Sequence, residues 1–250
     1  MNKRSALIFS AGLFLLAVAF FIIFLYNGTG KKEGAIILPQ GSAQLTENVD
    51  IAQRNNEKVT AATVDASNVQ AVIGTLERPA GYELSALVTY YYEDTNKSFT
   101  SHLWSNGSIQ RGAVTNSDGQ IEKNALLTAS HIYIWGDESD VYYRGQRDRF
   151  TVEDELRMPT YESVLALSAD SIKEAKTTNY EGRLCIYVQS EYDSNITRDW
   201  YIDIANALLI ACDTKDNGEL IYSMRCTSLK VGEQDEELFA LPSGGVPFNN

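Results

Sequence analysis

Short apolar runs separated by polar turn residues fill the second half of the chain. Four of them cover residues 183–191, 197–204, 206–213 and 219–229. Each has the length and the β-branched and aromatic content of a strand. The links are so short that successive strands must run antiparallel. The pattern predicts a meander with one continuous apolar face, which needs a cover of helices, a second sheet or a ligand.

The register of this meander follows from matching the apolar faces, because a slip of one residue turns every side chain over. Matching places Leu184, Ile186 and Val188 opposite Ile204, Ile202 and Trp200. Continued across the sheet, the same rule pairs Trp200 with Leu209, Leu209 with Met224, Ala211 with Tyr222, and Ala207 with Cys226.

The three cysteines can be placed in this register. Cys226 points to the apolar face, whereas Cys185 and Cys212 point away from it. Cys185 and Cys226 lie three strands apart, about 14 Å, and a disulfide tolerates a Cα separation of only about 7 Å. We therefore expect three free, mostly buried thiols.

A second antiparallel set precedes this meander. Residues 82–92 alternate between apolar and polar, and the turn Asp94-Thr95-Asn96 returns the chain so that Phe99 and Leu103 face Tyr92 and Val88. Asn106-Gly107 predicts a tight hairpin leading to a strand over 108–115. Further strands are expected near 120–129, 131–135 and 141–144, which gives about nine or ten strands in all.

Short helices are predicted at two places. Val69, Val72, Ile73 and Leu76 repeat at helical spacing behind the candidate caps Asp65 and Ser67. Between the two sheet halves, Pro159 and Thr160 start a helix through Leu165. Ser168 or Asp170 then caps a second helix through Ile172 and Ala175. The acidic run at residues 153–155 is interpreted as a solvated loop.

Three short motifs carry a resemblance to a known family. Trp200-Tyr201-Ile202-Asp203, Ala207-Leu208-Leu209 and Phe239-Ala240-Leu241-Pro242 resemble the C-terminal half of the outer-membrane lipoprotein carrier-like (LolA/LolB/RseB-like) superfamily of bacteria. The similarity covers roughly residues 64–242. It implies an α+β fold, in which a curved antiparallel half barrel wraps a few short helices and leaves a space for an acyl chain.

The N-terminal segment predicts a membrane anchor. Residues 5–26 carry no charge and are long enough to cross a bilayer as a helix. The rival interpretation is a signal peptide cleaved after Ala17-Val18-Ala19, which would leave a strongly apolar new terminus. The favoured organisation is a cytoplasmic tail (1–4), a transmembrane signal anchor (5–26), a flexible linker (27–60) and an extracytoplasmic domain (61–250). This single-pass arrangement lacks a lipobox cysteine, unlike the lipid-anchored members of the superfamily.

Charge and motif content narrow the function. The chain has 21 Lys and Arg against 33 Asp and Glu, a net charge of −12, which disfavours nucleic acid and anionic lipid headgroups as partners. His102 and His131 lack a second ligand at metal spacing and are expected to be solvent-facing strand residues. No phosphate loop or nucleophile elbow appears, so neither an enzyme nor a cofactor is expected. A hydrolase would be indicated only by carboxylates that cluster in a cleft and have strongly shifted pKa values.

The remaining clue is a set of large side chains at strand spacing. They line a cavity between sheet and helices in one interpretation and fill an ordinary core in the other. The candidate ligand-lining residues are Tyr90, Tyr92, Trp104, Tyr133, Trp135, Trp200, Tyr222 and Met224.

Two functions follow from these expectations. The first is a membrane-tethered binding module that holds a lipid, an acyl chain or another hydrophobic ligand in the half barrel. The alternative is a non-enzymatic interaction or sensor partner of an envelope protein. Germination lipoproteins of spore-forming bacteria resemble the same half barrel and act as partners of a cell-wall enzyme, so a sporulation or germination protein is one such partner.

Overall fold

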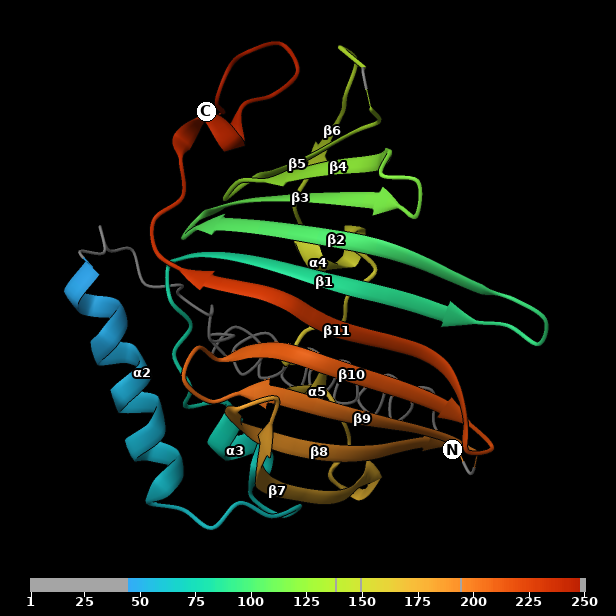
Figure 1. Ribbon diagram of the computed structural model, residues 1–250. Coiled ribbons are helices and arrows are strands. Elements are labelled where there is room, and N and C mark those ends of the chain that lie inside the picture. The colour runs from blue at the N-terminus through green and yellow to red at the C-terminus, as the bar shows by residue number, and fades with distance from the viewer. Residues whose placement is uncertain (1–44, 138, 149, 194, 248–250) are drawn as a thin grey trace, which may run out of the picture. The chain divides into compact units, whose positions relative to one another are not determined.

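One open antiparallel sheet organises the protein. The structure is a computed structural model that describes residues 45–137, 139–148, 150–193 and 195–247. Its 11 strands have the spatial order β6-β5-β4-β3-β2-β1-β11-β10-β9-β8-β7 (Figure 1). Strands β1 to β6 and β7 to β11 are two meanders, and the β1–β11 pair joins them. The expected antiparallel sheet with a few short helices is confirmed, with 11 strands in place of nine or ten.

The strands follow one another with short links. The first meander consists of β1 (Gly81–Tyr91), β2 (Asn96–Asn106), β3 (Ile109–Asn116), β4 (Ile121–Leu127), β5 (His131–Trp135) and β6 (Tyr143–Gln146). The second consists of β7 (Ile172–Tyr180), β8 (Arg183–Asp193), β9 (Ile196–Asp203), β10 (Leu208–Asp216) and β11 (Glu219–Val231).

Helical segments stand before, between and after the two meanders. Helices α2 (Leu45–Thr60) and α3 (Val69–Ile73) precede β1. The connection from β6 to β7 contains α4 (Val152–Glu155), α5 (Glu162–Leu165) and the 3₁₀ turn η1 (Ala169–Ser171). A second 3₁₀ turn, η2 (Glu236–Phe239), follows β11.

The main core lies on one face of the sheet, which we call the inner face. Helices α3, α4 and α5 lie behind the sheet on this side (Figure 1). The burial pattern of strand β2 reflects this cover. From Phe99 onward its residues alternate between buried and half-buried positions, as expected for a strand with one covered face. Trp200 of β9 is fully buried in this core, and Val164 of α5 packs from the helical side.

The C-terminal segment covers part of the opposite, outer face. Residues 232–247, which we call the strap, follow β11. Asn106 fixes its start, because its side-chain amide donates to Gln234 O (2.7 Å) and its Oδ1 accepts from Gln234 N (2.8 Å). Phe239 and Leu241 of the strap then pack with Ile109 and Leu126 in a second, smaller core. Part of the first meander, around β2 to β5, is thus covered on both faces.

The register from apolar matching is correct for the first strand pair of the second meander. Ile186 lies opposite Ile202 and Val188 opposite Trp200, as expected. The pairs from β9 to β11 are wrong, since Trp200 lies opposite Cys212, and Cys212 opposite Met224. The β9–β10 turn spans four residues, 204–207, and the register then shifts between Leu209 and Ala211. These irregularities turn Cys212 to the inner face, against the prediction.

Two local boundaries also differ from the expectation at the start of the domain. Phe99 lies opposite Val88 and Leu103 opposite Leu84, because the chain turns over Tyr92–Thr95, earlier than predicted. Helix α3 begins after Asn68 and ends at Ile73. The predicted caps Asp65 and Ser67 instead bond to each other, with Ser67 Oγ donating to Asp65 Oδ1 (2.6 Å).

The connection between the two meanders differs more from the sequence prediction. Helix α5 is confirmed, but the predicted second helix is wrong, because Ile172 and Ala175 belong to strand β7. The acidic run at residues 153–155 forms helix α4 and is not a loop. A capping box between Thr151 and Asp154 starts this helix, a signal that is present in the sequence.

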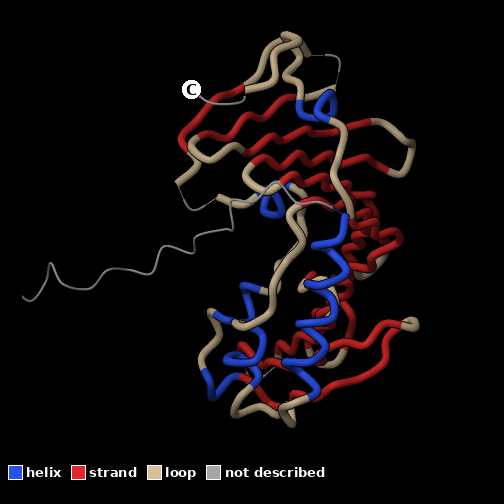
Figure 2. Tube along the Cα trace, turned by 90° about the vertical axis from the view of Figure 1, so that its left-hand side faces the viewer, coloured by secondary structure: helices blue, strands red, loops and turns tan. Residues whose placement is uncertain are grey.

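Part of the expected linker is helical. Helix α2 occupies residues 45–60, and Figure 2 shows it running along the side of the domain. Val59 is buried in the main core. Asn55, fully buried, donates to Glu77 O (2.7 Å) and Ala205 O (3.2 Å) and accepts from Glu77 N (2.9 Å). Because these contacts join α2 to the residues before β1 and to the β9–β10 turn, residues 45–60 are part of the folded domain.

The predicted transmembrane anchor, residues 5–26, lies outside the described residues. Within the part that is described, no helix is both long and apolar enough to span a membrane.

Replacing Asn55 with Ala tests the docking of α2. The change leaves the N–H of the half-buried Glu77 and two carbonyl groups without this partner, so we expect the free energy of unfolding to fall by about 2 kcal/mol. Urea unfolding followed by tryptophan fluorescence measures it. The control Gln53→Ala lies on the exposed side of the same helix and is expected to change stability by less than about 0.5 kcal/mol. Equal effects of the two changes would contradict the docking.

Candidate functional site

Among the described residues, little space is left between the inner face and the α4–α5 segment. The cavity there has a volume of about 20 Å³ and is lined by residues of β1, β2, β10, β11 and the α4–α5 segment. That volume holds about one water molecule, whereas ligand pockets usually occupy about 300–1,000 Å³. Leu103 and Met224, both buried, are among the residues that line this cavity. At this place the described residues leave no room for an acyl chain.

The side chain of Arg78 connects the two short helices, α4 and α5, that cover the inner face at this place. Arg78, just before β1, donates from Nη2 to both carboxylate oxygens of Glu162 on α5 (3.0 and 3.2 Å). Its Nη1 lies 3.7 Å from Oε1 of Glu153 on α4, and its guanidinium lies over the ring of Tyr161 (4.9 Å). Arg78 therefore links α4 and α5 to the segment just before β1.

The electrostatics of this cluster follow from burial and from one shared cation. Burial raises the pKa of Glu153, and the attraction of Arg78 only partly opposes it. Burial acts to lower the pKa of Arg78, but its neighbours Tyr82, Glu162 and Glu153 outweigh that effect and raise it, so the guanidinium stays charged. The sequence interpretation missed Glu153 because it treated the acidic run as solvated.

An open pocket lies on the other side of the sheet. It has a volume of about 320 Å³ and lies where the β2–β3 turn, the β4–β5 turn, β6 and the strap meet. We call it the strap pocket. His131, Tyr133 and Arg144 contribute to its wall, and Leu241 closes it from the strap.

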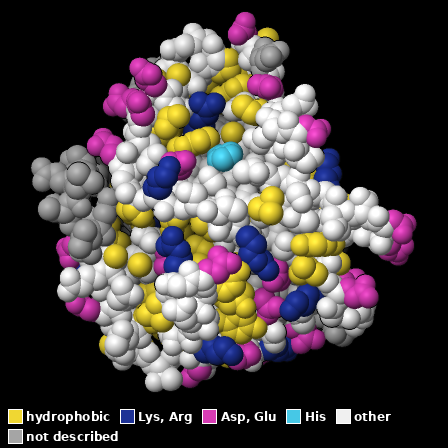
Figure 3. Space-filling model, viewed as in Figure 1, with side chains coloured by type: hydrophobic (Ala, Val, Ile, Leu, Met, Phe, Trp, Pro, Cys, Tyr) yellow, Lys and Arg dark blue, Asp and Glu magenta, His cyan; other side chains and the backbone are white. Residues whose placement is uncertain are grey.

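A cluster of tyrosines lies on the outer face of the second meander. Tyr180, Tyr187 and Tyr201, which we call the tyrosine patch, are half-buried on β7, β8 and β9. The ring centroids of Tyr180 and Tyr201 are 4.3 Å apart, and those of Tyr187 and Tyr201 are 5.2 Å apart. Hydrophobic side chains are visible among charged ones over these strands in Figure 3.

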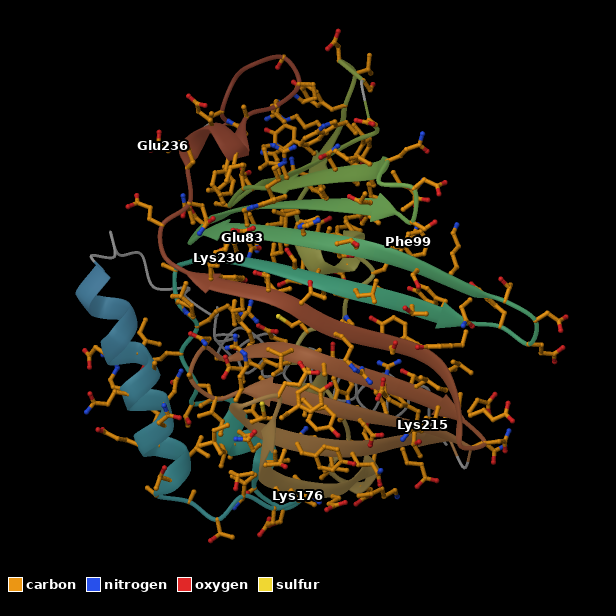
Figure 4. The ribbon with its side chains drawn as sticks, viewed as in Figure 1. Glu83, Phe99, Lys176, Lys215, Lys230 and Glu236 are labelled. Carbon is orange, nitrogen blue, oxygen red and sulfur yellow. The ribbon has the colours of Figure 1, made fainter. Side chains whose placement is uncertain are left out.

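Fixed charges surround the tyrosine patch. Asp199 is buried and accepts from Tyr187 Oη (2.8 Å) and from Lys215 Nζ (2.8 Å). Burial acts to raise the pKa of Asp199, but its hydrogen bonds from Lys215, Gln189 and Tyr187 outweigh this and lower it. Figure 4 labels Lys176 on β7, whose ammonium lies 5.2 Å from the ring centroid of Tyr187, and Lys215 on β10.

The eight predicted ligand-lining residues do not share one cavity. Tyr90, Trp200, Tyr222 and Met224 belong to the main core on the inner face. Trp104, Tyr133 and Trp135 belong to the second, smaller core on the outer face. Tyr92 is 59% exposed. Their role in ligand binding stays a prediction, and of the eight only Tyr133 lines the open strap pocket.

The other candidate chemical groups are placed as follows. His102 is half-buried, stacks on Trp104 and bonds to Ser85, so it is not a freely solvated residue. His131 is also half-buried. The expectation of three free thiols is confirmed, and burial raises the pKa of Cys185 and of Cys212 to about 12. No group of three His, Cys, Asp or Glu within the described part is arranged to hold a metal.

Comparison with known proteins finds similarity among solved structures. No protein-family model matches the chain, and no curated protein matches it. An uncharacterised conserved protein from Thermus thermophilus is similar with 8% identity and a TM-score of 0.43, over 74% of this chain and 90% of that chain. The Pseudomonas aeruginosa MucA/MucB complex is similar with 13% identity and a TM-score of 0.42, over 79% of this chain. This chain spans 63% of the length of the matched chain in that complex.

A third match carries the family name expected from the sequence. A LolA superfamily protein from Nitrosomonas europaea is similar with 8% identity and a TM-score of 0.34, over 76% of this chain and 97% of that chain. Because these TM-scores are below 0.5, the likeness carries no argument, and function has to be inferred from this chain's own residues.

Replacing Arg78 with Met tests the buried ion cluster. Glu153 would then stay buried without a counter-charge, so we expect a loss of about 3–5 kcal/mol at pH 7. The raised pKa of Glu153 means that the native state binds its proton more tightly than the unfolded chain. The stability from this proton is complete below the ordinary glutamate pKa and is lost as the pH rises through the raised value.

Urea unfolding at pH 7 and at pH 5 measures this effect. We expect the deficit of Arg78→Met to shrink at pH 5, and Glu153→Gln added to it to restore part of the stability at pH 7. Lys176→Met, which breaks an exposed pair with Glu174, is the control and is expected to cost less than about 1 kcal/mol. A deficit that Glu153→Gln leaves unchanged would show that the cluster does not act as described.

Proposed function

We propose that the chain is a non-enzymatic binding module, tethered to the cell membrane by residues 5–26 and facing the extracytoplasmic side. Its ligand is another envelope protein, which docks on the tyrosine patch. The observation that carries this proposal is the contrast between the two faces of the sheet. Between the inner face and the α4–α5 segment the described residues leave about 20 Å³, whereas the tyrosine patch leaves aromatic side chains half-exposed.

The chemistry of the patch favours a protein partner. Tyrosine joins a large apolar ring to a polar tip at low cost in side-chain entropy, and it is enriched at the centres of protein interfaces. The ion pair between Asp199 and Lys215 holds the polar surroundings of the rings in place. A surface that is already ordered loses little side-chain freedom when a partner binds.

The lipid-carrier interpretation, the first that the sequence suggests, has less support. Holding an acyl chain on the inner face would require α4 and α5 to move away from the sheet. That movement would break the contacts of Arg78 with Glu162 and Glu153 and would expose buried core residues such as Val152 and Val164. A fixed tether would also prevent a carrier from moving between membranes.

Site-specific photocrosslinking tests the proposed docking surface. p-Benzoylphenylalanine replaces Tyr201 in one variant and Tyr92, an exposed tyrosine in the turn between β1 and β2, in a second. We expect ultraviolet irradiation of native membranes to give one discrete protein adduct from position 201 and no matching adduct from position 92.

A competition assay shows whether the patch is responsible. Added unlabelled wild-type chain should suppress the adduct, whereas a chain with Lys176→Glu and Tyr187→Ala should suppress it at least about tenfold less well, because the two changes remove hot-spot contacts. Unchanged urea stability of this double variant excludes unfolding as the cause. Equal adducts from both positions, or equal competition by both chains, would overturn the proposal.

A further inference from the structure

The strap pocket has the size and the location of a small-ligand site. Its volume of about 320 Å³ lies at the lower end of the range for ligand pockets. It is built from the first meander and the strap, so it is separate from the tyrosine patch on β7, β8 and β9. The protein partner proposed above does not account for it.

The charge at this pocket, which the exposed Arg144 carries, is unusual for this chain. Acidic residues outnumber basic ones by 33 to 21 overall, yet no carboxylate is among the described residues that line the pocket. Arg144 of β6 does line it, and within the described part of the chain this guanidinium has no ion-pair partner. An arginine without a carboxylate, beside an apolar wall, is suited to binding an anion.

The hydrogen bonds among Arg144, His131 and Ser130 show which of these groups can donate to a ligand. Arg144 Nη2 lies 3.1 Å from His131 Nε2, and a guanidinium can only donate, so Nε2 must accept. His131 is then neutral with its proton on Nδ1, which donates to Ser130 Oγ (2.8 Å). Since Ser130 Oγ accepts that bond, its own hydroxyl proton is available for a ligand. The pocket thus offers one positive charge, on Arg144, and one neutral donor.

The other wall is apolar and aromatic. The rings of Tyr133 and Tyr142 meet edge to face with centroids 5.7 Å apart. Ile109 and Leu241, both buried, and Val246 complete this wall. A ligand that fits therefore carries its charge at one end and a compact apolar body at the other.

We propose that the strap pocket binds a small monocarboxylate with a compact apolar or aromatic body. Its carboxylate accepts from Arg144 and Ser130, and its body packs against Tyr133, Tyr142 and Leu241. A single negative charge matches the single cation, whereas a phosphate dianion would leave excess charge beside a neutral histidine. This site goes beyond the proposed partner binding and does not depend on it.

Fluorine-19 NMR titration of the full-length chain in a non-ionic detergent tests the proposal. The probes are 4-fluorophenylacetate and its neutral analogue 4-fluorophenylacetamide, which has almost the same shape. We expect the wild-type chain to bind the acid at least about tenfold more tightly than the amide, because charge-assisted hydrogen bonds are the stronger ones.

Three variants make the result specific. Arg144→Gln should bind both probes equally, and Lys97→Gln, an exposed cation on β2, should keep the wild-type preference. Ser108→Trp places a large ring at the exposed rim of the pocket and should abolish the binding of both probes. The proposal is overturned if the wild type binds neither probe, binds them equally, or keeps its preference in Arg144→Gln.

Discussion

The pairing of β1 with β11 is the contact on which the rest of the structure depends. It brings together residues as distant in the sequence as Tyr82 and Val231, and it makes one sheet from two meanders that are each built from local turns. Glu83 and Lys230 add an ion pair across it on the outer face (Figure 4). Neither meander alone would give α3, α4 and α5 a face wide enough to cover, so the main core exists only once this long-range pair has formed.

Once the sheet is complete, the two faces are used differently. The inner face is filled by side chains from both meanders and is closed by α4 and α5, which Arg78 holds together. The strap covers the outer face of the first meander, and the tyrosine patch lies on the outer face of the second. The two candidate recognition sites among the described residues, the tyrosine patch and the strap pocket, therefore lie on the outer face.

The sequence predicts the elements of this fold better than their connections. Alternation identified both meanders, and matching faces placed Val188 opposite Trp200 correctly. The same rule failed after Trp200, because a four-residue turn and a register shift cannot be read from apolar matching. It also could not show that Glu153 is buried, although the capping box at Thr151 indicated the helix that carries it.

The candidate sites were hardest to predict. Successive side chains along a strand face opposite sides of a sheet, so Trp104 and Trp200 could not be assigned to different cores before the register was known. The tyrosine patch and the strap pocket each combine residues from at least three elements, and no local motif marks either of them. Arg144 lies in a short exposed strand, and only the folded chain shows that none of the described carboxylates pairs with it.

Native mass spectrometry of the full-length chain, before and after organic extraction, tests the closed interior most directly. The closed core predicts the mass of the chain alone in both samples. A bound mass in the acyl-lipid range that disappears on extraction would contradict this account, because the inner face would then have to open for a ligand.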